Sequence, residues 1–214
     1  SFIAGTSEKG AQPVDVVGAA ELAKQGSPSI VQFVKTVTSA QSSLGESNRY
    51  NGGAGSASIN LRGLGSSRTL VLMNGHRLAN STAAAFQGGG ADLNVIPTAA
   101  IGRIEILKDG AAATYGSDAI AGVVNFITRR YTNEGDVTIG VSKPRGGAEE
   151  KRISATKGFG SIEQDGFNFM LSVQHDERTK LDAKDRNFGS TGKVFFNYQG
   201  QNYRFQQFSA SPIP

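Results

Sequence analysis

The side chains that could bind a metal ion are few and scattered. The chain contains two histidines and no cysteine, and neither His76 nor His175 has a second ligand at the spacing that zinc sites use. Four acidic residues are close enough in sequence to suggest a Ca²⁺ site: Asp176, Glu177, Asp182 and Asp185. A solvated charged loop explains them better, because acidic and basic residues are interleaved in DERTKLDAKDR. We therefore predict no metal site.

The sequence supports phosphate binding and catalysis no better than metal binding. Lys108-Asp109-Gly110 is the one stretch that invites comparison with a phosphate-binding loop. However, the chain has no Gly-x-x-x-x-Gly-Lys, and the span from Gly110 to Gly116 has the wrong spacing and no lysine. No nucleophile, base and acid stand out as a group. We predict no cofactor and no enzymatic activity, and a nucleotide-using enzyme is a remote alternative.

Composition narrows the class of protein further. The 214 residues can form one or two domains, and 38% of them are apolar with 28 glycines. The formal charge of +4 comes from interleaved acidic and basic residues, which does not suggest a nucleic-acid surface. No apolar run is long enough for a transmembrane helix, whereas a membrane strand needs an apolar residue only at every second position. Ser1-Phe2 does not begin a signal peptide, so export would require its earlier removal.

The stretch RIEILKDGAAATYGSDAIAGVVNFIT, residues 103–128, organises the chain. Alternation in Arg103–Leu107 predicts a strand, and the β-branched residues of Val123–Thr128 predict a second strand. Between them, Asp109-Gly110 predicts a break and Ser117-Asp118 a single helical turn. The small residues of this segment predict a bend in which chain passes close to chain.

The segments before it predict a compact mixed domain. Val14–Val17 predicts a short strand and Ala19–Gln25 a helix that ends at Gly26. Ser27 as N-cap and Pro28 at the first position predict the start of a second helix. Its apolar stripe predicts a core-facing side: Ile30, Val31, Phe33, Val34 and Val37.

Two polar, small-residue loops flank the next strands. Residues 39–58 and 79–90 predict loops, and Ile59–Arg62 predicts a strand that Gly63 and Gly65 interrupt. Thr69–Met73 predicts a strand, and Asn74-Gly75 predicts a tight hairpin turn, because a type I′ turn needs positive φ at both central residues.

After residue 130, apolar and polar residues alternate in three segments of about ten residues, at 137–142, 152–159 and 167–174. Such segments are typical of a transmembrane β-barrel wall, and a soluble β-sandwich would show the same alternation. Residues 194–198 and 203–205 predict a further hairpin.

These residues resemble the plug domain of TonB-dependent outer-membrane receptors of Gram-negative bacteria. The resemblance covers roughly the first 130 residues, a length typical of one domain. Its matching pieces are INLRGLG at 59–65, LVLMNGHRL at 70–78, and residues 101–128, with weaker similarity at 14–37.

The resemblance implies an α+β plug domain, a small mixed sheet with short helices, over residues 1–131. It implies that residues 132–214 are the first antiparallel strands of a 22-stranded transmembrane β-barrel, ending in an extracellular loop. The chain would then be a fragment of that barrel, or the remaining barrel segment a separate chain. The family's energy-coupling segment is not recognisable before Phe2. The implied partners are the TonB-ExbB-ExbD energy complex, outer-membrane lipid and a small-molecule or oligomeric substrate.

By the same resemblance, Arg62 and Arg103 match two plug arginines that pair with barrel glutamates and lock the plug. A guanidinium suits this role because it makes bidentate bonds and keeps its charge. The local alternative is that both are solvated or paired nearby, for example Arg103 with Glu105.

The loops also resemble the family's outward plug apices, which contact substrate. The implied contact residues are small, polar or aromatic, which suits hydrogen bonding and stacking: Tyr50, Asn51, Ser66, Ser67, Phe86 and Gln87. The alternative for each of these residues is that it belongs to an ordinary surface loop and contacts no substrate. Asn74, Gly75, Gly110 and Gly116 are predicted to be structural turn residues.

Active uptake of a scarce or bulky nutrient, with the plug gating the barrel, is therefore the function that the sequence favours. A secreted or surface β-rich ligand-binding module without a transport role is the rival. The substrate is not specified by these residues.

Overall fold

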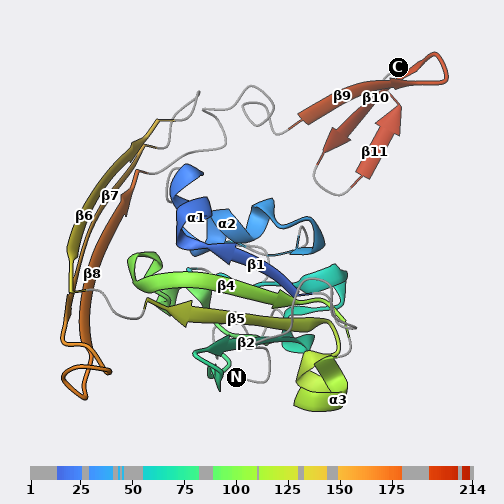
Figure 1. Ribbon diagram of the computed structural model, residues 1–214. Helices are drawn as coiled ribbons and strands as arrows, with labels where there is room; N and C mark the ends of the chain where they lie inside the picture. The colour runs from blue at the N-terminus through green and yellow to red at the C-terminus, as the bar shows by residue number, and fades with distance from the viewer. Residues whose placement is uncertain are drawn as a thin grey trace. The chain divides into compact units, whose positions relative to one another are not determined.

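The computed structural model describes most of the chain (Figure 1). The described residues are 14–25, 29–40, 43, 45, 55–81, 89–109, 111–129, 133–143, 149–179, 193–206 and 209–212. They divide into two compact units, residues 1–137 with 154–174 and residues 138–153 with 175–214. None of the helices among the described residues is long and apolar enough to cross a membrane.

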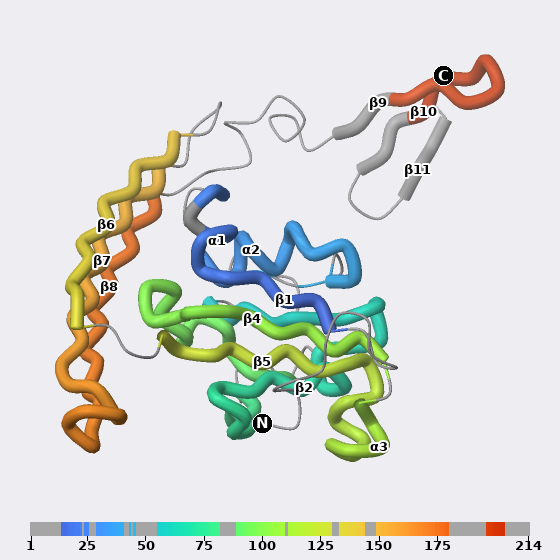
Figure 2. The backbone as a smooth tube through the Cα atoms, viewed as in Figure 1, coloured from blue at the N-terminus to red at the C-terminus, as the bar shows by residue number. Residues whose placement is uncertain are grey.

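A five-stranded mixed sheet forms the centre of the first unit, in the order β1-β4-β5-β2-β3. Its strands are β1 (Val14–Gly18), β2 (Thr69–Met73), β3 (His76–Arg77), β4 (Ile101–Leu107) and β5 (Gly122–Thr128). β2 and β5 are parallel, and the other pairs are antiparallel. The strands predicted at 14–17, 69–73, 103–107 and 123–128 are thus confirmed, and β4 and β5 lie side by side in the middle (Figures 1 and 2).

Short helices cover the two faces of this sheet. One core cluster joins α1 (Ala19–Lys24) and α2 (Ile30–Thr36) to the sheet through Leu22, Phe33, Ile104 and Phe126. The other joins α3 (Ala111–Tyr115) to Leu72 and Val123. Phe126 and Val123 are fully buried because each face of β5 is covered.

The start of α2 differs from the prediction. The N-cap is Ser29, whose hydroxyl accepts the N–H of Gln32 at 3.2 Å, while the Gln32 side chain accepts the N–H of Ser29 at 3.0 Å. This reciprocal pair satisfies two backbone N–H groups at the start of the helix. The predicted cap, Ser27, is therefore two residues too early. The predicted apolar stripe is confirmed at Ile30, Val31, Phe33 and Val34, which are buried, whereas Val37 is the C-cap residue and is partly buried against the same core.

The strand predicted at Ile59–Arg62 is wrong. Leu61–Gly63 forms a 3-10 turn, η2, in which Arg62 has φ of 55°. Side chains take the hydrogen bonds that a strand would need: Leu61 N–H donates to Thr69 Oγ1 at 3.0 Å, and Gly65 N–H donates to Asn60 Oδ1 at 2.8 Å. The bend predicted after Asp109 contains the one-turn helix α3 and the 3-10 turn η7 (Ser117–Ala119).

The Asn74-Gly75 hairpin is confirmed. Met73 pairs with His76 across the turn, and Asn74 and Gly75 have φ of 51° and 83°. The Asn74 carboxamide oxygen also accepts from the N–H and hydroxyl of Thr128 at 2.9 and 3.1 Å. The turn therefore connects β2 to β3 and holds the end of β5. Gly116 likewise has positive φ, 86°, whereas Gly110 lies outside the described residues.

Two further sheets follow the plug-like sheet. One has the order β6-β7-β8, with β6 at Gly135–Ser142, β7 at Glu150–Phe159 and β8 at Phe169–Arg178. Hydrogen bonds from Gly158 to Glu134 and from Thr179 to Glu149 make both pairs antiparallel. The other has the order β11-β10-β9, with β9 at Lys193–Tyr198, β10 at Gln201–Gln206 and β11 at Ser209–Pro212. The predicted fold class, an α+β plug followed by antiparallel strands, is confirmed. The boundary at 131/132 stays a prediction.

Part of the charged loop predicted after residue 175 is strand. Asp176 and Glu177 lie in β8, and Asp176 pairs with Arg152 of β7. Glu150 and Arg178 form a second cross-strand pair at 2.7 Å. Cross-strand ion pairs stabilise such a ladder, which explains why a charged sequence forms a strand at this position. Asp182 and Asp185 lie outside the described residues.

Candidate functional site

Two of the six predicted apex residues lie in the described part of the chain. Ser66 and Ser67 form the 3-10 turn η3 (Ser66–Arg68) just before β2, with Ser66 buried and Ser67 exposed. Tyr50, Asn51, Phe86 and Gln87 lie outside the described residues, within segments 46–54 and 82–88. The structure does describe the roots from which both segments emerge.

The root of segment 82–88 rests on η3. The Ser66 hydroxyl donates to the carbonyl of Gly89 at 2.5 Å. A Cβ atom at Gly90 would lie 3.0 Å from Ser66 Cβ and 3.1 Å from its carbonyl oxygen. Gly90 also has φ of 118°, so this close approach requires glycine. Gly89 and Gly90, which follow segment 82–88 in the sequence, therefore lie directly beside Ser66 and Ser67.

The same root is closed on its other side. Asn80 forms an antiparallel bridge with Ala91, and Ser81 N–H donates to the Gly90 carbonyl at 2.8 Å. Residues 80–81 and 90–91 thus form a narrow neck for segment 82–88.

Asp92 joins this neck to the root of segment 46–54. Its carboxylate Oδ1 accepts the N–H of Ala57 at 3.0 Å and the N–H of Asn94 at 3.1 Å. Asn94 Nδ2 donates to the Gly55 carbonyl at 2.8 Å, and Leu93 N–H donates to the Ala57 carbonyl at 2.8 Å. The two loop roots are thereby held against each other.

We call residues 55–57, 66–67, 80–81 and 89–94 the apex base. In the sequence, Asn51 is four residues before Gly55 and Phe86 is three residues before Gly89. The apex base therefore joins Ser66 and Ser67 to the described residues that follow segments 46–54 and 82–88. Asp92 is a site residue that was not predicted from the sequence, although an acidic residue before a short helical turn is an N-cap signal.

Arg62 is bound locally to the segment before β5. Its Nε donates to the Ala121 carbonyl at 3.2 Å and its Nη2 to the Ile120 carbonyl at 2.8 Å. The side chain holds η2 against the start of β5. A guanidinium has five N–H donors, so these two bonds leave donors for a further acceptor.

Arg103 makes the local pair that the sequence left open. Its Nε donates to Glu105 Oε1 at 2.8 Å, and the Glu105 side chain is 5% exposed whereas that of Arg103 is 42% exposed. Glu105 Oε2 accepts from Asn125 Nδ2 at 3.1 Å, and Asn125 Oδ1 accepts the N–H of Gly75 at 3.0 Å. A polar relay thus crosses the sheet from Arg103 to the 74–75 turn. It supplies the partners that a buried carboxylate needs.

The structure does not bring Arg62 and Arg103 together. Arg62 binds the carbonyl of Ala121, while Arg103 pairs with Ile127 of β5. Six residues of strand separate these points, or roughly 20 Å. Near Arg62, the end of β4 is followed by Lys108, which forms an ion pair with Asp15. The locking role of the two arginines stays a prediction.

Burial and charge perturb one titratable group beside the sheet. Tyr115, at the end of α3, packs against the cluster that contains Leu72 and Val123. Burial raises the pKa of its phenol above 10.0, and the Glu105 carboxylate raises this pKa further because it repels a phenolate. Within the described residues, no three His, Cys, Asp or Glu side chains come together as a metal site.

Together, a mixed-sheet plug, an apex base and following antiparallel strands define a plug-type receptor domain. The family model of the TonB-dependent receptor plug domain matches residues 6–123. The chain belongs to the TonB-dependent receptor family.

Known relatives agree with this membership. Over 188 residues the chain is 31% identical to the vitamin B12 transporter BtuB of Vibrio vulnificus strain CMCP6, covering 87% of this chain and 28% of that protein. It is 37% identical over 146 residues to the probable TonB-dependent siderophore receptor PirA of Acinetobacter baumannii, covering 62% of this chain and 19% of that protein. These relatives are named as transporters and receptors, not as enzymes.

Solved structures share the fold. A mutant of the ferric enterobactin receptor PfeA of Pseudomonas aeruginosa, with enterobactin bound, superposes with a TM-score of 0.65 at 22% identity, covering 92% of this chain and 30% of that one. The siderophore receptor PirA of Acinetobacter baumannii superposes with a TM-score of 0.62 at 24% identity, covering 89% of this chain and 27% of that one. The chain spans less than a third of the length of the proteins it matches.

Proposed function

We propose that this chain forms the plug and first wall strands of a receptor in the outer membrane of a Gram-negative bacterium. The receptor takes up a scarce or bulky nutrient by TonB-driven transport. Substrate binds at the apex segments, the TonB-ExbB-ExbD complex pulls on the segment before β1, and the plug rearranges to open a path. Residues 1–131 are the plug, and residues 132–214 begin a 22-stranded β-barrel that further strands complete.

The observation that carries this proposal is the apolar face of the β6-β7-β8 sheet. Eight of its side chains are between 49% and 74% exposed: Val137, Ile139, Val141, Ile153, Phe159, Phe169, Leu171 and Val173. The two hydrogen bonds that set the register place these odd-numbered residues on one face. An apolar surface of this extent indicates contact with membrane or another apolar surface. Lipid is the environment that suits strands of this length.

The opposite face of the same strands is polar. Ser154 and Thr156 are buried, and Thr156 Oγ1 lies 3.1 Å from Ser172 Oγ. A wall with an apolar outer face and a polar inner face is the pattern of an outer-membrane barrel. This supports the transport proposal over a soluble sandwich, whose inner face would be the apolar one.

The test uses a Gram-negative host that lacks its own receptors for the probes and expresses the complete receptor. Uptake of labelled cyanocobalamin and of ferric enterobactin is measured with and without functional TonB. We expect TonB-dependent uptake of at least one probe, and the receptor in the outer-membrane fraction. A protein that purifies without detergent as a monodisperse monomer, with no TonB-dependent uptake, would contradict the proposal and favour the secreted module.

A further inference from the structure

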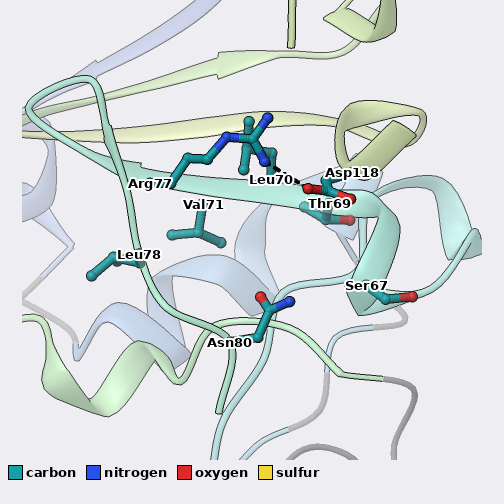
Figure 3. Close-up of a pocket in the computed structure, with 8 residues that line it drawn as sticks. All are labelled: Ser67, Thr69, Leu70, Val71, Arg77, Leu78, Asn80 and Asp118. Atoms are coloured by element: carbon teal, nitrogen blue, oxygen red, sulfur yellow. Dashed lines mark hydrogen bonds and ion pairs between the residues drawn. The ribbon is translucent and has the colours of Figure 1, made fainter. Parts of the chain in front are cut away.

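A notch opens at the edge of the plug sheet, beside the apex base. It has a volume of about 200 Å³ and lies where the chain after β3 separates from β2 (Figure 3). Leu78 still pairs with β2, because its N–H donates to the Val71 carbonyl at 3.1 Å. Two residues later, Asn80 bridges to Ala91 instead. Within the described part of the chain, the edge of β2 therefore has no neighbouring strand at Thr69 and Leu70.

The unpaired edge presents a main-chain acceptor. Carbonyls alternate between the two edges of a strand, so the Thr69 carbonyl points to the same side as that of Val71. Among the described residues, none donates a hydrogen bond to the Thr69 carbonyl at this edge, although Thr69 is only 3% exposed. Buried main-chain acceptors without a donor are rare. This carbonyl is a ready partner for a ligand N–H.

The walls of the notch favour an uncharged polar ligand. The Asn80 amide, which makes no hydrogen bond to other described residues, points toward Thr69 (Figure 3). Leu70 and Val71 lie on opposite faces of β2 and are 6% and 3% exposed, so Val71 is the apolar residue on the Asn80 side (Figure 3). Charge is balanced across the notch, since Arg77 and Asp118 pair at 2.6 Å. A charged ligand would gain no net attraction from this pair.

We propose that the notch is a binding subsite for a neutral carboxamide carried by the transported nutrient. A carboxamide resembles a peptide group: its N–H donates to the Thr69 carbonyl, and its oxygen accepts from Asn80 Nδ2. This restores the hydrogen bonding that a neighbouring strand would supply at this edge. The proposal rests on the proposed function, because it assigns to the same receptor a second contact beside the apex segments.

The test measures equilibrium binding to the complete receptor in detergent. The probe is labelled cyanocobalamin, a neutral molecule with several side-chain carboxamides, and negatively charged ferric enterobactin is the comparison. Asn80→Leu fills the notch and removes the amide, while Asn80→Asp keeps the size and removes the N–H donor. Thr114→Ala changes an exposed polar residue on α3 outside the notch and is the matched control.

We expect a Kd for cyanocobalamin about tenfold higher for Asn80→Leu, from the loss of one or two hydrogen bonds, and a smaller rise for Asn80→Asp. Thr114→Ala should bind like the unchanged receptor. Unchanged binding in both Asn80 variants, or no binding of cyanocobalamin at all, would overturn the subsite. TonB-dependent uptake of either probe, together with cyanocobalamin binding that both Asn80 variants leave unchanged, would overturn the subsite and leave the proposed function standing. A receptor that purifies without detergent as a monodisperse monomer and shows no TonB-dependent uptake of either probe would contradict the proposed function as well.

Discussion

Asp92 gives the sharpest test of the apex base. Replacing Asp92 by alanine removes the acceptor for two main-chain donors, the N–H of Ala57 and the N–H of Asn94. Ala57 is 1% exposed, so its N–H cannot turn to water without opening the base. Asn94 is exposed, and its N–H can be hydrated. The two losses are therefore unequal.

The magnitude follows from these two environments. A buried N–H left without an acceptor costs about 1–3 kcal/mol, and loss of an N-cap side chain costs about 1 kcal/mol. The sum, about 2–4 kcal/mol, is concentrated in the apex base, because Ala57 and Asn94, whose N–H groups lose their acceptor, both belong to the apex base. We expect the base to open locally while the sheet stays folded.

Hydrogen exchange of the assembled receptor measures this opening directly. A loss of 2–4 kcal/mol corresponds to amide exchange at Ala57 that is about 30- to 1,000-fold faster. Asp92→Asn keeps a neutral acceptor and should give a smaller change. Glu163→Ala removes an exposed carboxylate from a turn and should leave Ala57 unchanged. Equal acceleration at Ala57 and throughout β4 and β5 would refute a local role, and unchanged exchange at Ala57 would refute the hydrogen bond's contribution.

Three further outcomes follow from the sheet. Gly75→Ala should lower the free energy of unfolding by about 1 kcal/mol in thermal unfolding, because Gly75 has φ of 83°; an unchanged midpoint would contradict the turn's role. Tyr115 should titrate above pH 10.0 in absorbance at 295 nm. Because the pKa of Tyr115 is higher in the folded protein than in the unfolded chain, the free energy of unfolding should fall as pH rises above 10.0. Tyr115→Phe should remove the part of this decrease that comes from Tyr115. Replacing Arg62 and Arg103 by alanine should each increase protease sensitivity and leak of large antibiotics, with additive effects because the sites are far apart; unaltered protection in the double variant would refute the lock.

Local sequence patterns predicted the elements whose signals are local. The Asn74-Gly75 turn depends on two adjacent residues that tolerate positive φ, and β5 depends on a continuous β-branched run. In both cases the residues that determine the structure lie within a few positions of one another. The helix α2 was also predicted, but its cap was placed two residues early, because Ser27-Pro28 and Ser29 are both plausible helix starts.

Interactions between distant residues account for the errors and omissions. Leu61 leaves the strand conformation because Thr69, eight residues away, accepts its N–H. The Asp92–Ala57 bond that closes the apex base joins residues 35 positions apart. The notch at Thr69 exists because the chain after Leu78 turns to Ala91. None of these partners can be read from spacing, since each depends on how the loops fold back onto the sheet.

The most diagnostic stretch of the sequence and the apex base are different parts of the plug. Residues 103–128 supply the two central strands, where Glu105 and Asn125 bond to each other at full burial and Asn125 continues to Gly75. Each of these buried polar groups depends on the next one for its hydrogen-bond partner, so the stretch is specific to this fold. The apex segments join the sheet through Asp92, Ser66 and main-chain groups at their roots. The contacts at the roots are made by residues outside segments 46–54 and 82–88, so the amino-acid sequence of these segments can change without removing a root contact.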